Sequence, residues 1–469
     1  SFRFLDRSLA MNGTEGKSEW SLSSWREREI LQQPSYPDQT AVDRVEAQLS
    51  RLPPLVNQEE VIRLKVLLCQ VQKGERFLLL GGDCAERFMD CASSTIEKKF
   101  KILLQMSLIL IWGGKLPMVR IGRIAGQYNK PRSSKTEIVD GKEILCFKGD
   151  GINDFDPKNR IHDPDRLVQM YFHSVATLNF LRSLISGGFS DLHASAHWDL
   201  GYVKNTKNRT EYERIVQQIV GSLNFLETCG IPSDPVVQAA DFFIGHEGLV
   251  LLYESALTRK INGKYFNLGA HFLWIGDRTR QLDHAHVEYF RGIENPIGIK
   301  VGPTTVPSEL VEIIRKLNPK KEDGKIVLIT RLSDEKVADL LPLLISAVQR
   351  AELKVVWQCD PMHGNTVKTH TGFKTRNFDT ILSELMKSFE IHTSLGSHLG
   401  GVHYELTGED VTECTGGPED LGVHNLPENY TSYCDPRLNY AQSIEMAFRI
   451  APLIRKSASM RNRSLNKNF

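Results

Sequence analysis

Eight short apolar runs between residues 77 and 405 each end in charged or metal-binding side chains. The runs begin at Phe77, Met118, Phe242, Phe272, Ile297, Ile326, Val355 and Gly401. Polar residues follow them, in the same order, at Cys84, Arg123, Glu247, Arg278, Lys300, Arg331, His363 and Glu405. Strands that are buried on both faces of a parallel sheet read as continuous apolar runs, and a (β/α)8 barrel carries its chemistry where such strands end. The pattern therefore predicts an α/β fold, a (β/α)8 TIM barrel with one site ringed by these residues.

The second half of the chain keeps the regular spacing that such a barrel needs. From Phe272 onward the runs recur at roughly the length of one strand–helix unit. Segments with helical periodicity lie between them, at about 308–314 after Pro307 and from Ser333 to about 345. A further apolar run, Phe189–Leu192, is short and lies among Gly, Ser and His, so it is not assigned to the barrel.

A long insertion separates the second run from the third. Asp140-Gly141 stands between two strand-like segments, which predicts a hairpin over about 135–147. Asp163 and Pro164 predict the start of a helix that ends before Gly187. Inserted structure of this kind commonly forms a lid, an oligomer interface or an effector site, and simple packing against the flank of the barrel is the alternative.

A second helix is predicted in the same insertion, where Thr210 and Glu213 have the spacing of a capping box. The expected organisation is a flexible tail over 1–18, an N-terminal extension over 19–60, the barrel over 61–455 and a C-terminal tail over 456–469. The inserted elements, at about 134–235, fall within the barrel segment.

Composition narrows the class of protein. The 469 residues are 41% hydrophobic and 25% charged, with a formal net charge of +1, as in a soluble globular protein that has no bulk attraction to nucleic acid or to a membrane surface. The longest apolar stretch, Ile102–Trp112, is too short to span a bilayer. The eight cysteines form no Cys-x-x-Cys pair, which favours a reduced intracellular compartment. The expected location is the cytoplasm, with the plastid as the alternative if a transit peptide has been removed.

Four cations, one at the end of each of four different predicted strands, indicate an anionic ligand. They are Arg123, Arg278, Lys300 and Arg331. A lysine within a strand as apolar as 297–301 costs several kcal/mol unless it is paired or bound to an anion. Guanidinium groups suit phosphate and carboxylate. Ion pairs with nearby carboxylates are the alternative. A second basic loop, with Lys130, Arg132 and Ser133, is a candidate cradle for another phosphate.

Four further residues are candidate metal ligands, namely Cys84, His363, Glu405 and Asp435. A thiolate, an imidazole and two carboxylates suit a borderline divalent ion such as Mn²⁺, Co²⁺, Fe²⁺, Zn²⁺ or Cd²⁺. Each residue also has a structural alternative: Cys84 as core filler, His363 as a helix cap and Glu405 as an ion-pair partner. The sequence contains no Gly-x-Ser-x-Gly elbow, no phosphate-binding loop of the Walker type and no dinucleotide fingerprint.

Seven segments together resemble one family, the type II (plant-like) 3-deoxy-D-arabino-heptulosonate 7-phosphate (DAHP) synthases. They are Leu80–Glu86, Gly122–Ser133, Trp274–Asp283, Gly298–Pro303, Trp357–Thr366, Gly400–Glu405 and Cys434–Asn439. The resemblance covers roughly Trp20 to Arg455. It implies a (β/α)8 barrel and a metal-dependent condensation of phosphoenolpyruvate with erythrose 4-phosphate that releases phosphate, the first step of the shikimate pathway.

The resemblance also implies residue roles. Cys84, His363, Glu405 and Asp435 match the metal-ligand positions, with Mn²⁺ the expected ion. Phosphoenolpyruvate positions are matched by Arg123, Asp277, Arg278, Lys300 and Arg331, and sugar-phosphate positions by Lys130, Arg132 and Ser133. Lys300, His363 and Arg278 are the expected catalytic residues. Asp277 stands where family members often carry Glu, and His284 replaces a common Gly for no evident reason.

Regulation and assembly are further implications of the resemblance. Aromatic amino acids are expected effectors, a homodimer or homotetramer the expected assembly, and a chorismate mutase a candidate partner. A synthase of the amino-sugar analogue used in secondary metabolism, or a mainly regulatory paralogue that binds aromatic amino acids, are the alternatives. Because Cys434 precedes Asp435, oxidation of the metal-free protein is expected to pair Cys434 with Cys84.

Overall fold

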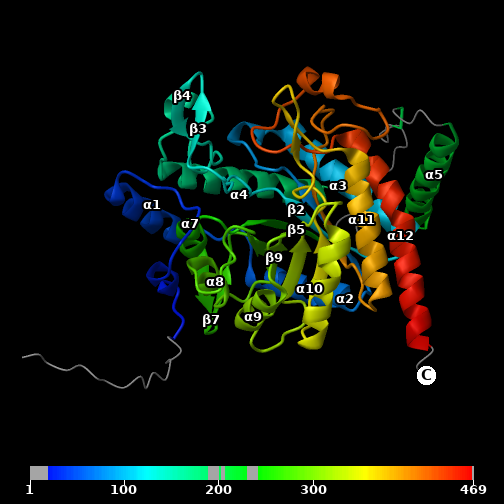
Figure 1. The fold of residues 1–469 in the computed structure, drawn as a ribbon, viewed down its shortest axis with the longest axis horizontal. Coiled ribbons are helices and arrows are strands. Elements are labelled where there is room, and N and C mark those ends of the chain that lie inside the picture. The colour runs from blue at the N-terminus through cyan, green and yellow to red at the C-terminus, as the bar shows by residue number, and fades with distance from the viewer. Residues whose placement is uncertain (1–18, 188–199, 202–205, 230–240, 467–469) are drawn as a thin grey trace, which may run out of the picture.

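The computed structural model describes residues 19–187, 200–201, 206–229 and 241–466 (Figure 1). Within it, all eight predicted strands close into one barrel in the order β1-β14-β11-β10-β9-β8-β5-β2, and every neighbouring pair is parallel. The strands are β1 (Phe77–Gly82), β2 (Met118–Arg123), β5 (Phe242–Glu247), β8 (Phe272–Ile275), β9 (Ile297–Val301), β10 (Ile326–Thr330), β11 (Val356–Cys359) and β14 (Gly401–Glu405). The predicted fold class is confirmed.

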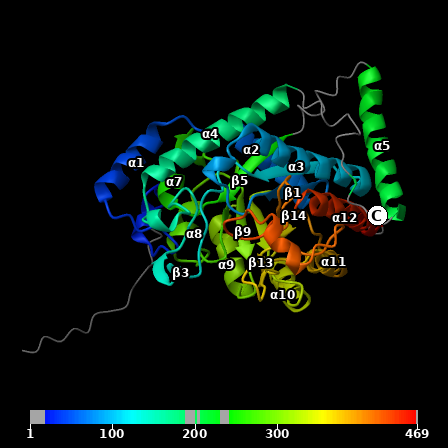
Figure 2. The ribbon, with the colours of Figure 1, turned by 90° about the horizontal axis from the view of Figure 1, so that it is seen from above.

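Helices surround the barrel and close one of its ends (Figures 1 and 2). The surrounding helices are α3 (Ser93–Gly114), α7 (Leu251–Ala256), α8 (Ala285–Phe290), α9 (Pro307–Leu317), α10 (Val337–Arg350), α11 (Phe378–Ser394) and α12 (Tyr440–Asn466). Helix α2 (Gln58–Gln72) packs Leu64, Leu68 and Val71 against the inward-facing side chains of the strands. Helix α2 closes the end of the barrel where the strands begin. The opposite end, where the strands finish, is therefore open for a site.

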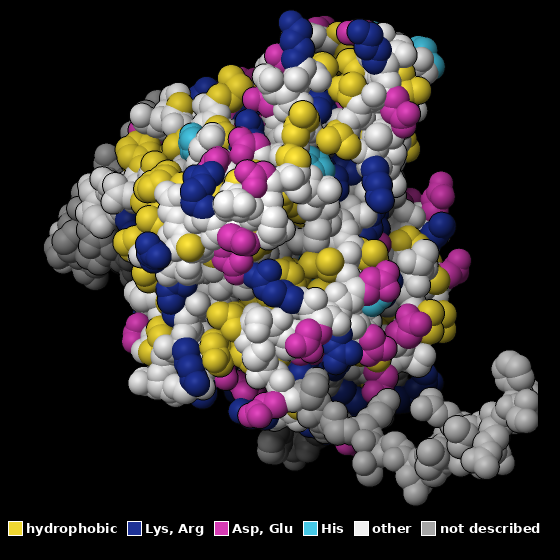
Figure 3. All heavy atoms as spheres, turned by 90° about the vertical axis from the view of Figure 1, so that its left-hand side faces the viewer, with side chains coloured by type: hydrophobic (Ala, Val, Ile, Leu, Met, Phe, Trp, Pro, Cys, Tyr) yellow, Lys and Arg dark blue, Asp and Glu magenta, His cyan; other side chains and the backbone are white. Residues whose placement is uncertain are grey.

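The N-terminal segment adds a short 3-10 helix, η1 (Ser24–Glu27), and helix α1 (Gln39–Arg51). At the other end of the chain, α12 continues to Asn466 through most of the segment expected as a tail, and it packs along α3. The expected N-terminal tail, 1–18, lies outside the described residues. On the face drawn in Figure 3, basic and acidic side chains are interspersed, in keeping with the net charge of +1.

The insertion after β2 contains the predicted hairpin, β3 (Thr136–Val139) and β4 (Lys142–Leu145). Asp140 and Gly141 both have positive φ, 50° and 74°, as the tight turn between twisted strands requires. Helix α4 (Asp165–Ser186) follows, with Pro164 as its N-cap, while the Asp163 carboxylate accepts the Asp165 N–H at 2.9 Å. The signals for the hairpin and for this helix are therefore correct to within two residues.

The predicted capping box at Thr210 is wrong. Helix α5 (Thr206–Thr228) begins four residues earlier, so Thr210 and Glu213 both lie inside it, and the Glu213 carboxylate accepts from Arg209 Nε at 2.8 Å. The run Phe189–Leu192 lies outside the described residues. A second hairpin, β6 (Thr258–Ile261) and β7 (Lys264–Asn267), was not predicted, although its Asn262-Gly263 turn is a recognised hairpin signal. A small third pair, β12 (Val367–Lys368) and β13 (Lys374–Thr375), follows β11.

No helix among the described residues is long and apolar enough to cross a membrane.

Candidate metal centre and anion-binding cavity

The strand register brings the predicted site residues to one level. Gly82, the last residue of β1, is aligned with Arg123 on β2 and with Glu405 on β14. Gly82 has a φ of 145°, and a Cβ there would lie 2.5 Å from the Arg123 carbonyl oxygen, so only glycine fits this close approach. Because Cys84 follows two residues later, its thiol reaches the space between the ends of β2 and β14.

A cavity of about 430 Å³ opens at these strand ends. All eight residues that the sequence predicted to bind substrate line it: Arg123, Lys130, Arg132, Ser133, Asp277, Arg278, Lys300 and Arg331. His363 and Asp435 line it as well, whereas Cys84 and Glu405 are almost fully buried, at 1% and 0% exposure. The cavity thus has a cationic wall above a buried group of potential metal ligands.

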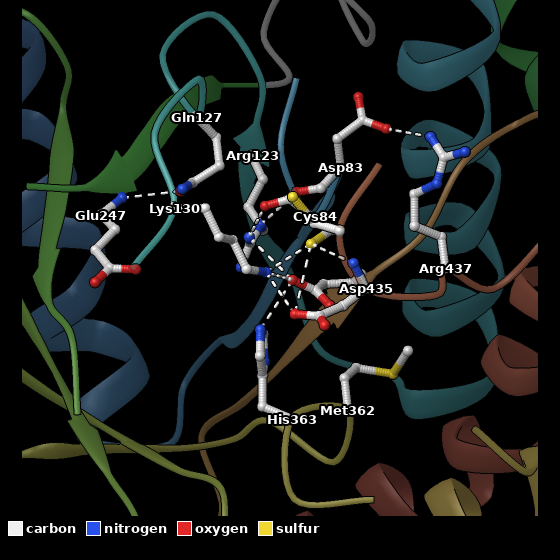
Figure 4. Close-up of polar contacts among 12 residues, drawn as sticks. Asp83, Cys84, Arg123, Gln127, Lys130, Glu247, Met362, His363, Asp435 and Arg437 are labelled. Carbon is white, nitrogen blue, oxygen red and sulfur yellow. Dashed lines mark hydrogen bonds and ion pairs between the residues drawn. The ribbon is translucent and has the colours of Figure 1, made fainter. Parts of the chain in front are cut away.

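Three of the four predicted metal ligands, Cys84, His363 and Asp435, point towards one another at the base of this cavity (Figure 4). One ligand atom each from Cys84, Glu405 and Asp435 lies within 4.8 Å of the other two. His363 Nε2 lies 2.9 Å from Glu405 Oε1, and Cys84 Sγ lies 3.8 Å from Asp435 Oδ2. A thiolate, an imidazole and two carboxylates at this spacing fit a divalent metal ion.

The charge balance keeps both carboxylates of this group ionised. Burial alone would raise the pKa of Glu405, but the positive charges of His363, Lys130 and Arg376 hold that pKa well below its usual range. Burial opposes ionisation of Asp435 too, and Lys130 is the largest of the effects that nevertheless keep its pKa well below the usual range. Burial raises the pKa of the Cys84 thiol well above its usual range. The thiol therefore depends on a bound metal to displace its proton.

Lys130 lies among these ligands rather than at the outer wall of the cavity. Its Nζ is 2.6 Å from Cys84 Sγ, 2.8 Å from Asp435 Oδ2 and 3.3 Å from Glu405 Oε1. Burial alone would lower the pKa of Lys130, but the charges around it, Asp435 foremost, raise that pKa well above its usual range. In this arrangement an ammonium ion balances the acidic ligands.

The cationic wall is partly paired, as the ion-pair alternative anticipated. Lys300 forms a buried ion pair with Asp360, and Arg331 NH1 lies 2.8 Å from Asp277 Oδ2. Arg278 NH2 donates instead to Ser133 Oγ at 3.1 Å, and no carboxylate within the described ranges pairs with it. Arg278 and the Ser133 loop therefore adjoin each other, as a common phosphate site would require.

Arg123 is held rigidly by four contacts. Its Nε donates to the Asp83 carbonyl at 2.7 Å and its NH2 to the Cys84 carbonyl at 2.8 Å. Its NH1 lies 2.8 Å from His403 Nε2, and its NH2 lies 3.2 Å from Glu405 Oε1. Arg123 thereby connects the metal ligands to the anion-binding wall.

Asp360, directly after β11, is a candidate site residue to which the sequence pattern gave no role. Its Oδ2 accepts from His363 Nδ1 at 2.7 Å and is paired with Lys300, while its Oδ1 accepts from the His363 N–H at 3.2 Å. A carboxylate on one imidazole nitrogen orients the other towards a metal. The Asp-Pro-Met-His spacing at the end of β11 is the signal that could have identified it.

Glu247, at the end of the third strand, was also left without a role. Its carboxylate lines the cavity, and its Oε1 has no hydrogen-bond partner among the described residues. Burial raises the pKa of Glu247, and the positive charges of Lys130, Lys300 and Arg123 only partly oppose the rise. A Cβ on Gly276 would lie 2.1 Å from Glu247 Oε1, so the glycine makes room for the carboxylate.

His284, whose presence the sequence did not explain, does not line the cavity. It is the N-cap residue of α8, and its Nε2 lies 3.5 Å from the Glu29 carboxylate in the N-terminal segment.

The sequence matches known proteins over nearly its whole length. A family model described as the Class-II DAHP synthetase family matches residues 20–451. The chain is 49% identical to a phospho-2-dehydro-3-deoxyheptonate aldolase of Neurospora crassa, over 94% of this chain and 96% of that protein. It is 45% identical to the protein of the same name from Streptomyces coelicolor, over 92% and 97% of the two chains. Among solved structures, a phospho-2-dehydro-3-deoxyheptonate aldolase from Francisella tularensis SCHU S4 is 15% identical, with a TM-score of 0.45 over 93% of this chain and 99% of that one.

Proposed function

The chain belongs to the Class-II DAHP synthetase family and is an enzyme of the first step of the shikimate pathway, and we propose that the cavity described above is its active site. In it, phosphoenolpyruvate and erythrose 4-phosphate would condense beside a divalent metal, Mn²⁺ by preference, with release of phosphate. The observation that carries this proposal is that Cys84, Glu405 and Asp435, with His363 beside Glu405, meet below a cationic wall at one end of one barrel.

Cys84, His363, Glu405 and Asp435 would hold the metal. The bound ion would supply Lewis-acid polarisation of the erythrose aldehyde. Asp360 would keep His363 Nε2 directed at the ion. Lys130 contacts the ligand side chains of Cys84 and Asp435. Once a bound metal neutralised these ligands, the Lys130 ammonium would interact with the bound substrates instead.

The cationic wall would bind and orient the two anionic substrates. Arg123, Arg278, Lys300 and Arg331 would hold phosphoenolpyruvate, with Asp277 orienting Arg331. Arg132 and Ser133 would hold the sugar phosphate, next to Arg278, which donates to Ser133. Donors fixed in advance in a cavity that excludes water stabilise developing negative charge at low reorganisation cost.

The chemistry then joins C3 of phosphoenolpyruvate to the aldehyde carbon, and the aldehyde oxygen takes up a proton. Water adds to the cationic C2 and loses one proton, which leaves a hydroxyl on C2. The C2–O bond to phosphate then breaks as that hydroxyl gives its proton to the leaving phosphate, and the ketone remains. Glu247 would accept the proton from water, since its side chain lines the cavity, its Oε1 has no hydrogen-bond partner among the described residues, and burial raises its pKa.

A direct assay tests this function. Loss of phosphoenolpyruvate and release of phosphate should both require erythrose 4-phosphate, stop after thorough chelation and return with Mn²⁺. His363→Ala should abolish turnover, whereas His370→Ala, an exposed histidine in the next loop, should retain it. Wild-type turnover after chelation, or in His363→Ala, would refute the metal proposal.

Aromatic amino acid effectors, a homodimer or homotetramer and a chorismate mutase partner also stay proposals. The hairpin β3–β4 and helices α4 and α5 are more than a barrel needs, and they are where such ligands or partners would bind. Titration of Phe, Tyr and Trp in the same assay, together with light scattering, tests each of them.

A further inference from the structure

One metal ligand does not come from a barrel strand. Asp435 lies in the segment between β14 and α12, whereas Cys84, His363 and Glu405 follow or end β1, β11 and β14. Three ligands are thus placed by the sheet register, and the fourth needs a separate means of support. Two buried arginines support the segment that carries it: Arg376 donates to the carbonyl of Pro436, and Arg437 belongs to the segment and pairs with Glu413.

Arg376 joins the segments of three ligands. The residue is fully buried, at 0% exposure. Its NH1 donates to Glu405 Oε2 at 2.7 Å and to the carbonyl of Pro436, the residue after Asp435. Its Nε donates to Thr366 Oγ1 at 2.8 Å, in the loop that carries His363. One guanidinium therefore ties the Glu405, Asp435 and His363 segments together.

The contact with Arg376 gives the two carboxylate oxygens of Glu405 different partners. Oε2 is taken by Arg376, while Oε1 faces His363 Nε2 at 2.9 Å and Lys130 Nζ at 3.3 Å. Arg123 NH2 also lies 3.2 Å from Oε1. The contact with Arg376 therefore holds the carboxylate so that Oε1, rather than Oε2, faces the other ligands.

Arg437, two residues after Asp435, ties its own segment to that of Cys84 (Figure 4). Its NH1 donates to Asp83 Oδ1 at 2.7 Å, and Asp83 directly precedes Cys84. Its NH2 and Nε donate to the two oxygens of Glu413, at 2.8 and 3.0 Å. Arg437 thus links the Cys84 and Asp435 segments, but it touches no ligand side chain itself.

We propose that Arg376 is a positioning residue of the metal centre, which sets the separation of Glu405 and Asp435 and directs Glu405 to coordinate through Oε1. This inference rests on the proposed metal site. A positioning role and simple charge repulsion predict opposite changes in metal affinity. The Arg376 guanidinium repels a nearby divalent ion, so by Coulomb's law alone the removal of Arg376 would tighten metal binding. A positioning role predicts the reverse, because partners that orient metal ligands typically change metal affinity about 10–100-fold when they are mutated.

Mn²⁺ binding to the metal-free full-length protein, followed by the EPR signal of free Mn²⁺, separates the two effects. Arg376→Met should weaken binding about 10–100-fold, and excess Mn²⁺ should restore much of the turnover. Arg376→Lys keeps the charge but cannot reach three partners, so an intermediate loss is expected. Lys374→Met is the matched control, since its half-exposed ammonium lies 2.9 Å from Asp435 Oδ1 but bridges no segments. Its affinity should be unchanged or tighter.

The outcomes distinguish this inference from the proposed function. If the wild type fails to bind Mn²⁺, the metal site itself is refuted. If the wild type binds it and Arg376→Met binds as tightly or more tightly, only the positioning role is refuted. Should Arg376→Met fail to fold by circular dichroism, Thr366→Val, which removes one anchor of Arg376, and Arg376→Lys decide the matter. Wild-type affinity in both would overturn the inference, and weaker binding in both would support it.

Discussion

Replacing Asp360 with Asn is the most informative single perturbation of this site. Asp360 is fully buried, and its Oδ2 serves both His363 Nδ1, at 2.7 Å, and the Lys300 ammonium. Burial alone would raise the pKa of Asp360, but His363 and Lys300 hold it well below its usual range. The carboxylate is therefore charged at neutral pH, and Asn removes that charge with little change of shape. The amide nitrogen would face two donors and could accept from neither.

The expected losses follow from these two contacts. Without its acceptor, His363 loses the fixed orientation of Nε2, which should weaken Mn²⁺ binding about 10–100-fold. Lys300 is left buried without a counter-charge, and removal of one partner of a buried ion pair costs about 3–5 kcal/mol. Phosphoenolpyruvate should recover part of this cost, because its anion gives Lys300 a new partner in the folded protein.

Two measurements check this prediction. EPR titration gives the Mn²⁺ affinity, and denaturant unfolding of the metal-free protein with and without phosphoenolpyruvate gives the stability. Asp339→Asn, an exposed aspartate in helix α10, is the control and should change neither. An Asp360→Asn protein with wild-type Mn²⁺ affinity would refute the positioning of His363, and one with wild-type stability would refute the cost of unpaired Lys300.

Three further predictions concern other parts of the structure. Glu247→Gln should lower kcat about 100-fold or more with little change in the KM for phosphoenolpyruvate, and an unchanged kcat would exclude Glu247 as the proton acceptor. Oxidation of the metal-free protein should join Cys84 to Cys434, which belong to one packed cluster with Phe147, and peptide mapping that finds Cys84 free would contradict this. Burial lowers the pKa of Lys325 to about 7, whereas its ordinary value, expected in the unfolded chain, is 10.5. The folded protein is therefore most stable, as far as Lys325 is concerned, above pH 10.5, and it loses that stability as the pH falls from 10.5 to 7. Raising the pH from 7 to 9 should therefore add roughly 2–3 kcal/mol to the wild type relative to Lys325→Met in urea unfolding, and parallel pH profiles would refute it.

The barrel was predictable because each of its strands is buried on both faces. Such strands must be apolar along their whole length, as Ile326–Thr330 and Phe272–Ile275 are, and this makes them visible without an alignment. The hairpin at Asp140-Gly141 was equally visible, since its turn needs positive φ at both positions. A sequence pattern confined to a few neighbouring residues therefore predicts local structure reliably here, because distant contacts did not alter that structure.

Weaker local signals failed at the ends of helices. Thr210 and Glu213 have the spacing of a cap, yet α5 starts earlier and places both inside the helix. Helix α12 continues to Asn466, through most of the segment expected as a tail. A capping contact contributes only about 1 kcal/mol, so it does not by itself fix where a helix begins.

The sequence by itself determined the kinds of chemistry available: a thiol, an imidazole, carboxylates and a row of cations, each at the end of an apolar run. Seven strand-end residues and the Lys130 loop could be named in advance, because a closed parallel barrel directs all its strand ends to one face. Only the tertiary structure decided how they are combined. It brought Asp435 in from outside the sheet, placed Lys130 among the ligands, and paired Asp360 with both His363 and Lys300. It also set Arg376 across three ligand segments. These contacts join residues tens to hundreds of positions apart, and since no local preference encodes such a distance, they arise only when the barrel closes.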